Sequence, residues 1–292
     1  MLSPVTNERK VLVFGGTGFL GSALSRHLRD QGFHVSTVAR HPHATYSTDL
    51  MEVDSNSLLH LLQREEPQVV INLVGCGLVS GSATDVQMSF LNGEFPQLLT
   101  EALGCLQEPK LIHVASSTEP TDSDGTTESL YSRTKSIGTS HIRRALDAKD
   151  ITGTVIILHN TYGPTQPPER FVRLVFDKAI QGDQFNLQFP DRVRDFIYLD
   201  DALQGLSAFV AEVPETKEVE LGTGEGVSLR EVAHRIYAGC GSSTNLISEA
   251  TPKSDPFRVR VAVNPALIVP KPRNIEVGIE QMLRDLNRKD TE

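Results

Sequence analysis

Short apolar runs alternate with amphipathic segments over the first 160 residues of the chain. Residues 11–14 form an apolar run that ends in glycines, which is typical of a buried parallel strand, and residues 69–74 form a second one. Further strands are expected at 35–39, 49–53, 111–115 and 154–159, and helical spacing at 20–28, 57–64, 85–103 and 131–147. This alternation predicts an α/β fold, a doubly wound parallel sheet with helices on both faces.

After about residue 160 the pattern becomes more irregular and richer in proline. Ser228 and Glu231 form a capping-box pair, which predicts the start of a helix that runs to about Ala238. The other elements expected here are helices near 169–181 and 274–287, a strand at 194–199 and a loop-rich stretch at 251–273.

These patterns predict two lobes in a chain of 292 residues, which is long enough to bury a sizeable core. The first lobe would contain residues 1–160, together with parts of 195–221 that return to it. Residues 161–292 would form a smaller lobe, also of α/β type.

Composition and charge exclude several classes of partner. The net charge is −9, with both signs mixed along the sequence, which argues against nucleic acid or an anionic membrane as the main partner. Three cysteines are too few for a disulfide framework or a zinc site, and the nine histidines show no ligand spacing. The first ten residues lack the apolar core of a signal peptide, and no apolar run approaches the ~20 residues of a membrane span. We therefore expect a cytoplasmic protein without a metal site.

A glycine-rich segment directly follows the first expected strand and opens the first helix. It runs from Gly15 to Gly21 and contains Thr17, Gly18, Phe19 and Leu20. Glycines at this spacing allow a tight turn, let the backbone approach a pyrophosphate and let the helix pack against the strand. The start of the helix then offers amide N–H donors to phosphates. Such glycines can also form a mere turn, but their place in the alternating pattern predicts dinucleotide binding.

The residues after the second and third strands bear on which dinucleotide binds. A carboxylate at the end of the second strand would normally accept the ribose hydroxyls of NAD, but this position holds Ala39, followed by Arg40. A guanidinium in its place favours a 2′-phosphate, hence NADP(H), although an ordinary surface arginine is the alternative. Asp54, just after the third strand, is placed either to meet the adenine amino group or to cap the next helix.

Tyr131 and Lys135 lie four residues apart, hence on one face of the helix expected at 131–147. A phenol has an ordinary pKa of about 10, and a nearby ammonium group would lower it, so the pair can act as acid and base. Ser117 follows the strand at 111–115 and is expected to face the ligand crevice, where a hydroxyl can hydrogen-bond a substrate carbonyl. Ser116 is the alternative for this role.

Together these residues resemble the extended branch of the short-chain dehydrogenase/reductase superfamily, the NAD-dependent epimerase/dehydratase family of nucleotide-sugar enzymes. Residues 160–164 (Asn-Thr-Tyr-Gly-Pro), 194–201 (Arg-Asp-Phe-Ile-Tyr-Leu-Asp-Asp) and 221–224 (Leu-Gly-Thr-Gly) resemble further motifs of that family. The resemblance covers nearly the whole chain. It implies a Rossmann fold in the first lobe, and Asn92 as the asparagine that organises the proton relay.

The resemblance also implies partners. A sugar nucleotide, expected to be dTDP-linked, would lie between the lobes, with Arg194 on its diphosphate and Arg258 or Arg260 assisting. Asn160 and Thr118 would also contribute to substrate binding. Members of this branch usually pair the helices at 85–103 and 131–147 into a four-helix interface, so a homodimer is expected.

Departures from the family's pattern favour one reaction. Family epimerases and 4,6-dehydratases usually hold NAD tightly, whereas Arg40 favours an exchangeable NADPH. The dehydratases carry Asp-Glu after the catalytic hydroxyl, and Thr118-Glu119 stands there instead. The short loop 119–129 most resembles that of the 4-ketoreductases that finish NDP-4-keto-6-deoxyhexoses for natural-product glycosylation. We therefore expect NADPH-dependent reduction at C4 in deoxysugar biosynthesis. An epimerase or dehydratase with tightly bound NAD is the first alternative, and a non-catalytic NADP-sensing regulator is a remote one.

Overall fold

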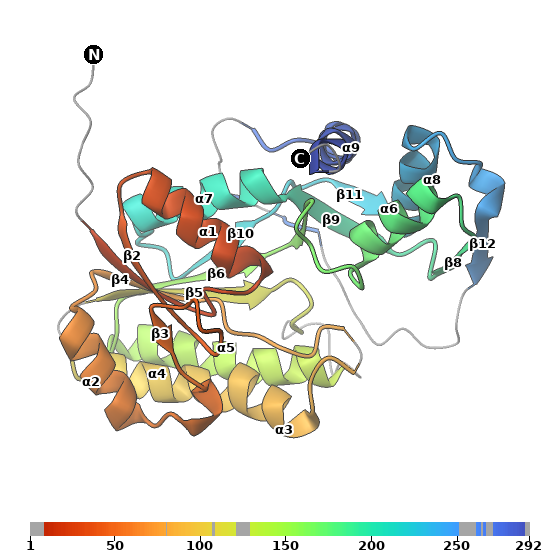
Figure 1. Ribbon diagram of the computed structural model, residues 1–292. Helices are drawn as coiled ribbons and strands as arrows, with labels where there is room; N and C mark the ends of the chain where they lie inside the picture. Colours follow the sequence, from red (N-terminus) through yellow and green to blue (C-terminus); the bar gives the residue numbers. More distant parts are fainter. Residues whose placement is uncertain are drawn as a thin grey trace, which may run out of the picture. The chain divides into compact units, whose positions relative to one another are not determined.

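The computed structural model describes residues 9–79, 81–106, 109–120, 129–250, 261–263, 265–266 and 271–289 (Figure 1). The chain divides into two compact units, the first made of residues 1–157 and 206–219 and the second of residues 158–205 and 220–292. The assignment of one lobe to the cofactor and the other to the substrate remains a proposal.

A seven-stranded sheet forms the centre of the first unit, in the order β10-β6-β5-β4-β1-β2-β3. The pairs β1–β2, β1–β4, β2–β3 and β4–β5 are all parallel. The strands are β1 (Lys10–Phe14), β2 (His34–Ala39), β3 (Tyr46–Ser47), β4 (Val69–Asn72), β5 (Lys110–Ser116), β6 (Gly153–Leu158) and β10 (Glu218–Leu221). This arrangement confirms the α/β fold with a large parallel sheet that the apolar runs predicted.

Helices cover both faces of this sheet, which is why its central strands β1 and β4 are largely apolar rather than alternating. α1 (Phe19–Asp30) lies on one face, and α2 (Ser55–Glu65), α4 (Phe95–Gly104) and α5 (Leu130–Ala148) lie on the other (Figure 1). In β1, Leu12 and Phe14 belong to the core shared with α2, α4 and α5. Val11 and Val13 alternate with them and are also buried.

Two expected elements of the first unit are wrong in detail. The strand predicted at 49–53 is absent, and a short 3₁₀ turn, η1 (Leu50–Glu52), occupies this place after β3. The side chain of Asp49 accepts a hydrogen bond from the N–H of Met51 (3.0 Å), and such a local bond competes with strand pairing. The helix predicted at 85–103 is interrupted: a π-helical turn, η2 (Ser89–Glu94), separates α3 (Asp85–Met88) from α4.

The second unit has a small mixed sheet. β9 (Val193–Tyr198) pairs in parallel with β7 (Asn160–Tyr162) and antiparallel with β11 (Gly226–Ser228). A separate parallel pair joins β8 (Phe185–Gln188) to β12 (Ile247–Ala250).

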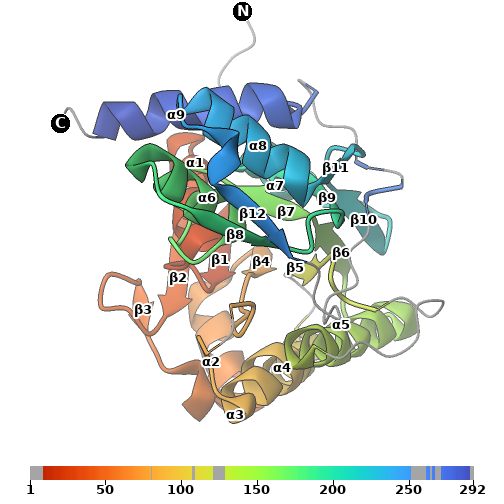
Figure 2. The same ribbon diagram turned by 90° about the vertical axis from the view of Figure 1, so that its right-hand side faces the viewer.

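Among its described residues this unit also contains the helices α6 (Phe171–Gln181), α8 (Leu229–Gly239) and α9 (Ile275–Lys289) (Figure 2). α8 packs against both α6 and α9, and the side chains of Phe176, Ile236 and Ile279 meet in the shared core. Ser228 caps α8 as the sequence predicted, because its hydroxyl accepts from the N–H of Glu231 (3.1 Å). A short turn, η3 (Thr244–Leu246), precedes β12, and α7 (Leu199–Ala211), which the sequence did not predict, contributes residues to both units. None of the described helices is long and apolar enough to cross a membrane.

Candidate active site

The turn from β1 into α1 is built from backbone. Gly15 has φ +79°, and its N–H donates to the carbonyl oxygen of Val38 in β2 (2.9 Å). A Cβ on Gly21 would overlap the backbone carbonyl group of Gly15 itself. Only glycine at position 21 therefore lets α1 pack this closely against the turn. Gly18 is the N-cap of α1 and supplies no side-chain acceptor, which leaves the first amide donors of the helix for a ligand. A pyrophosphate group fits such a turn.

The remaining residues of the glycine segment lie around this turn. Thr17 and Gly18 are exposed, and Phe19 and Leu20 are half-buried at the start of α1. Their contact with a dinucleotide remains a prediction.

Arg40 and Asp54 lie beyond the ends of β2 and η1. Arg40 is exposed, and its carbonyl oxygen accepts from the hydroxyl of Ser47 (3.3 Å). Asp54 caps α2: its Oδ1 accepts from the N–H of Ser57 (2.8 Å), and the Ser57 hydroxyl accepts from the Asp54 N–H (3.0 Å). These bonds with Ser57 hold the pKa of the Asp54 carboxyl below its usual range. The capping interpretation of Asp54 is thus confirmed, whereas a contact with adenine remains a prediction.

Lys135 reaches the carboxyl ends of two sheet strands. Its Nζ donates to the carbonyl oxygens of Val114 in β5 (3.1 Å) and Val74 after β4 (3.4 Å). The residue is 4% exposed. Burial lowers the pKa of its ammonium group, and the nearby Glu119 opposes that change. A lysine of this kind is poised to influence a neighbouring phenol.

Asn92 joins this region from the π-helical turn. Its Oδ1 accepts from the N–H of Cys76 (2.9 Å), and its Nδ2 donates to the Cys76 carbonyl (3.0 Å) and to the hydroxyl of Thr134 (3.1 Å). The segment after β4 is therefore fixed to α5 beside Lys135. A Cβ on Gly75 would lie 3.8 Å from the Asn92 Oδ1 and 3.9 Å from the Lys135 side chain, which shows how closely these groups converge.

Tyr131 lies in the first turn of α5, one turn before Lys135, and is half-buried. Ser129 caps this helix by accepting from the N–H of Ser132 (3.3 Å). The placement agrees with a phenol and an ammonium group on one helix face.

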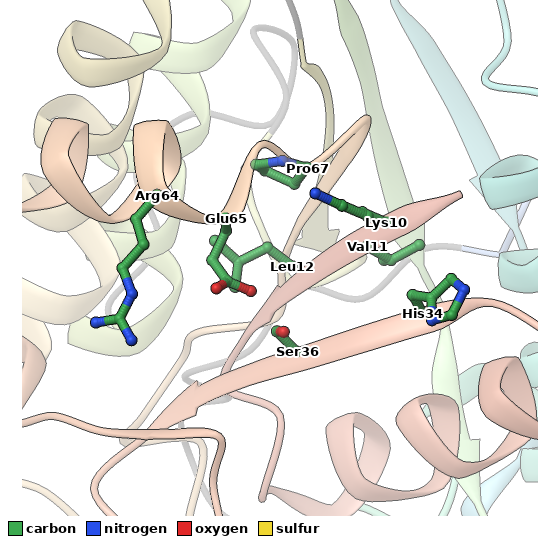
Figure 3. Close-up of a pocket in the computed structure, with 8 residues that line it drawn as sticks. All are labelled: Lys10, Val11, Leu12, His34, Ser36, Arg64, Glu65 and Pro67. Atoms are coloured by element: carbon green, nitrogen blue, oxygen red, sulfur yellow. The ribbon is translucent and has the colours of Figure 1, made fainter. Parts of the chain in front are cut away.

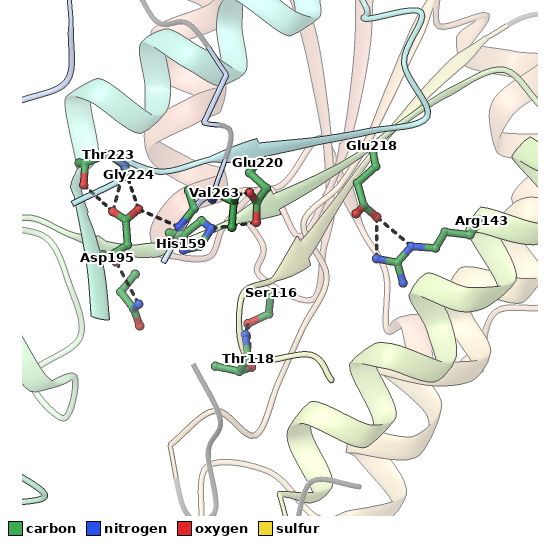
Figure 4. Close-up of polar contacts among 12 residues, drawn as sticks. Ser116, Thr118, Arg143, His159, Asp195, Glu218, Glu220, Thr223, Gly224 and Val263 are labelled. Carbon is green, nitrogen blue, oxygen red and sulfur yellow. Dashed lines mark hydrogen bonds and ion pairs between the residues drawn. The ribbon is translucent and has the colours of Figure 1, made fainter. Parts of the chain in front are cut away.

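Ser117 follows directly after β5 and is 3% exposed. The competing hydroxyl of Ser116 lies 2.8 Å from that of Thr118 and accepts from the Thr118 N–H (3.2 Å) (Figure 4). Ser116 is half-buried and engaged in this local turn, and the choice of Ser117 as the substrate-facing hydroxyl remains a prediction. Thr118 itself is buried in the same turn.

Within the second unit, Asn160 and Arg194 lie close to Asp195. The Nδ2 of Asn160 donates to the backbone carbonyl of Asp195 (3.0 Å), and Arg194, half-buried in β9, is the preceding residue. The Asp195 carboxylate is fully buried and accepts from the Thr223 N–H (2.9 Å), the Thr223 hydroxyl (2.6 Å) and the Gly224 N–H (2.9 Å) (Figure 4). Sequence inspection missed this role of Asp195, although the residue stands inside a quoted motif. Arg258 and its alternative Arg260 lie outside the described residues, and substrate binding by all these groups remains a prediction.

A hollow of about 440 Å³ opens at the start of β1, at the opposite end of that strand from the glycine turn (Figure 3). Its charged side chains already contact neighbours: Lys10 pairs with Glu66 (3.5 Å) and Arg64 lies over the ring of Tyr46. We therefore do not assign it to the candidate site. It is lined by Lys10, Val11, Leu12, His34, Ser36, Arg64, Glu65 and Pro67.

These features are those expected of a dinucleotide-binding α/β enzyme with a tyrosine–lysine pair. The chain belongs to the NAD dependent epimerase/dehydratase family, whose model matches residues 11–222, as the sequence motifs indicated. A Kitasatospora kifunensis protein named dTDP-6-deoxy-L-talose 4-dehydrogenase (NAD(P)(+)) is 28% identical over 275 residues, covering 86% of each chain. The dTDP-glucose 4,6-dehydratase of Salmonella typhimurium is 22% identical over 298 residues, covering 86% of this chain and 80% of that one.

The fold is shared with solved structures. The crystal structure of dTDP-glucose 4,6-dehydratase from Bacillus anthracis in complex with NAD superposes with a TM-score of 0.77 at 18% identity. The match covers 97% of this chain and 98% of that one.

Proposed function

We propose that this protein reduces the C4 ketone of an NDP-4-keto-6-deoxyhexose, with dTDP as the expected nucleotide and NADPH as the reductant. The observation that carries the proposal is the similarity, over 86% of both chains, to a protein named as a 4-dehydrogenase of dTDP-6-deoxy-L-talose that uses NAD(P)+. Dehydrogenation at C4 and reduction of a C4 ketone are the same hydride transfer in opposite directions.

The residues of the first unit supply what this reaction requires. Ser117 and Tyr131 would hydrogen-bond the C4 oxygen and polarise the carbonyl group. Bound NADPH supplies the hydride to C4. Tyr131 would give its proton to the developing alkoxide, and Lys135, with a water chain that passes Asn92, would restore that proton. Holding these groups in position accounts for much of the acceleration.

Three further assignments belong to the proposal. Arg40 would bind the 2′-phosphate of NADPH, since its exposed side chain follows β2 where a carboxylate would bind NAD. Asn160, Arg194 and Arg258 of the second unit would bind the sugar nucleotide. A homodimer through α3, α4 and α5 is supported by two exposed apolar side chains there, Val86 (70% exposed) and Ile137 (53% exposed).

The similarity to the Salmonella dehydratase supports a second candidate, a dehydratase or epimerase that keeps NAD bound. The two candidates differ in whether the cofactor exchanges. A ketoreductase consumes one NADPH per turnover, whereas an internal-redox enzyme returns its NAD unchanged.

The test is to add dTDP-4-keto-6-deoxyglucose with NADPH or NADH and follow the absorbance of the reduced nicotinamide. We expect NADPH to be consumed, and Tyr131→Phe to lower kcat at least ~100-fold while NADPH binding is retained. Tyr46→Phe, at a ring that contacts Arg64 and has no part in the candidate site, is the matched control and should leave kcat unchanged. No consumption of either cofactor, together with NAD retained by the purified protein, would favour the dehydratase or epimerase.

A further inference from the structure

Glu119 is a buried carboxyl group at the candidate active site that the proposed chemistry does not use. It is the third residue after β5 and is 6% exposed. Its Oε1 accepts a hydrogen bond from the backbone N–H of Ser116 (2.8 Å), while its own N–H donates to the carbonyl oxygen of Ser116 (3.0 Å). These two bonds close a tight turn that contains Ser117 and Thr118.

The same carboxyl group lies near Lys135, because it is bonded to Ser116, two residues after the Val114 carbonyl to which the Lys135 Nζ donates. Burial lowers the pKa of Lys135, and Glu119 is the stronger of the two neighbouring groups that oppose this, ahead of Cys76. Burial raises the pKa of Glu119, and the charge of Lys135 is the foremost opposing influence. A desolvated ammonium group depends on a nearby carboxylate more than an exposed one would, because solvent screens the attraction less.

Other titratable groups surround Lys135 on the elements packed against it. Cys76 follows β4, His113 lies in β5 and Tyr131 lies one turn earlier in α5. Burial lowers the pKa of His113 well below its ordinary value, and burial raises the pKa of the Cys76 thiol, so both favour their neutral forms. Within the described part of the chain, Glu119 is thus the carboxylate that balances the charge of Lys135.

These contacts argue against a direct role of Glu119 on the substrate. A base that removes a ring proton has to be free to reach that proton, whereas Oε1 of Glu119 is bonded to the N–H of Ser116 within its own turn. We propose that Glu119 is a positioning residue, which holds the turn that presents Ser117 and keeps Lys135 in its charged form. The inference rests on the proposed function in taking Ser117 and Lys135 as groups that contact substrate and cofactor.

Two substitutions separate the hydrogen bond from the charge. In Glu119→Gln the amide oxygen can still accept from the Ser116 N–H, but the negative charge is lost. In Glu119→Ala both are lost. The matched control is Glu101→Gln, which removes an exposed carboxylate from α4, outside the candidate site.

The first readout needs no substrate. The ionisation of Tyr131 is followed as the tyrosinate absorbance of each protein minus that of the same protein carrying Tyr131→Phe. Without the charge of Glu119, Lys135 loses its proton more easily and no longer stabilises the Tyr131 phenolate. The midpoint should therefore rise by roughly half a pH unit or more in Glu119→Gln and stay in place in Glu101→Gln. An unchanged or lowered midpoint in Glu119→Gln would overturn the proposal. Because this titration works even if no keto sugar is reduced, failure of the proposed function is recognised separately.

The second readout is kcat for the reduction. Glu119→Ala should lose at least ~10-fold more of kcat than Glu119→Gln, because only the glutamine keeps the turn. In the pH profile of kcat, the high-pH limb of Glu119→Gln should move in the same direction as the Tyr131 midpoint. Equal and nearly complete losses in both variants, with an unmoved high-pH limb, would make Glu119 a base and refute the positioning role. If Glu119→Ala does not fold, the titration of Glu119→Gln decides.

Discussion

The two units fix their loops in opposite ways. In the first unit the glycine turn is held by close backbone contact, because Gly21 leaves no room for a side chain against Gly15. In the second unit the loop at 222–224 is held by one buried side chain, Asp195, which gathers donors from Thr223 and Gly224. The first loop can thus be damaged by adding a methyl group, and the second by altering one carboxylate. The proposed binding of dinucleotide phosphates needs free backbone donors, and a loop without side chains supplies them.

The largest effect is expected at the buried carboxylate. Both carboxylate oxygens of Asp195 now accept hydrogen bonds. In Asp195→Asn one of them is replaced by an NH₂ group, which cannot accept from the donors that face it. This substitution should lower the free energy of unfolding by about 3 kcal/mol. Chemical denaturation measures this change. Asp191→Asn, an exposed position just before β9, is the control and should change stability by less than about 1 kcal/mol. Equal effects at the two positions would contradict the role given to Asp195.

A smaller loss of stability is expected in the first unit. Gly21→Ala forces α1 away from the turn, and overpacking of this kind costs about 2 kcal/mol. NADPH binding, measured by its fluorescence, should be lost as well. Gly104→Ala is the control, since it is also helical but its added Cβ would lie 3.7 Å from the nearest atom, an ordinary contact. Full NADPH affinity in Gly21→Ala would show that the turn tolerates a side chain.

The next effect is on the preference for NADPH over NADH, not on the stability of the fold. If Arg40 binds the 2′-phosphate, Arg40→Ala should lower the preference for NADPH over NADH roughly 10- to 100-fold, the value of one charged hydrogen-bonded contact. The ratio of the two dissociation constants is the measurement. Arg64→Ala, at the end of α2, should leave the ratio unchanged. A ratio that does not move in Arg40→Ala would remove the main argument for NADP(H).

The smallest effect is a pH dependence at Asp54. Its pKa is lowered in the folded state by the bonds with Ser57, so the carboxylate stabilises the fold above its ordinary pKa. That contribution is lost as the pH falls through the lowered pKa, below about pH 4. Asp54→Asn keeps a capping side chain without this titration, and its stability should fall less steeply on acidification. Parallel stability curves from pH 2 to 7 would show that the carboxylate adds nothing as an ion.

Features set by neighbours in sequence could be predicted. The buried runs of β1 and β4, the capping residues Asp54 and Ser228, and the glycine turn depend on local spacing or on local hydrogen bonds. The strand expected at 49–53 failed for the same local reason, because Asp49 bonds to the next turn instead.

Features set by distant contacts could not be predicted. No pattern around Glu119 signals that its carboxyl group turns back to Ser116, and no pattern reveals that Asn92 binds both Cys76 and Thr134. The sequence could name Asn92 through resemblance alone. The chemistry of the candidate site depends on these contacts across the chain.

The π-helical turn at Ser89–Glu94 also constrains how this chain can change its length. Each residue advances an α-helix by about 100°, and a π turn holds one residue more than an α turn. Deleting one residue there would convert the wide turn into an ordinary helical turn, and the helix after it would keep nearly the same phase. The buried stripe of α4, which includes Phe95, Leu99 and Leu103, would still face the core, whereas Asn92 would shift relative to Cys76 and Thr134. The loss of one residue from this segment should therefore damage the candidate site more than the core.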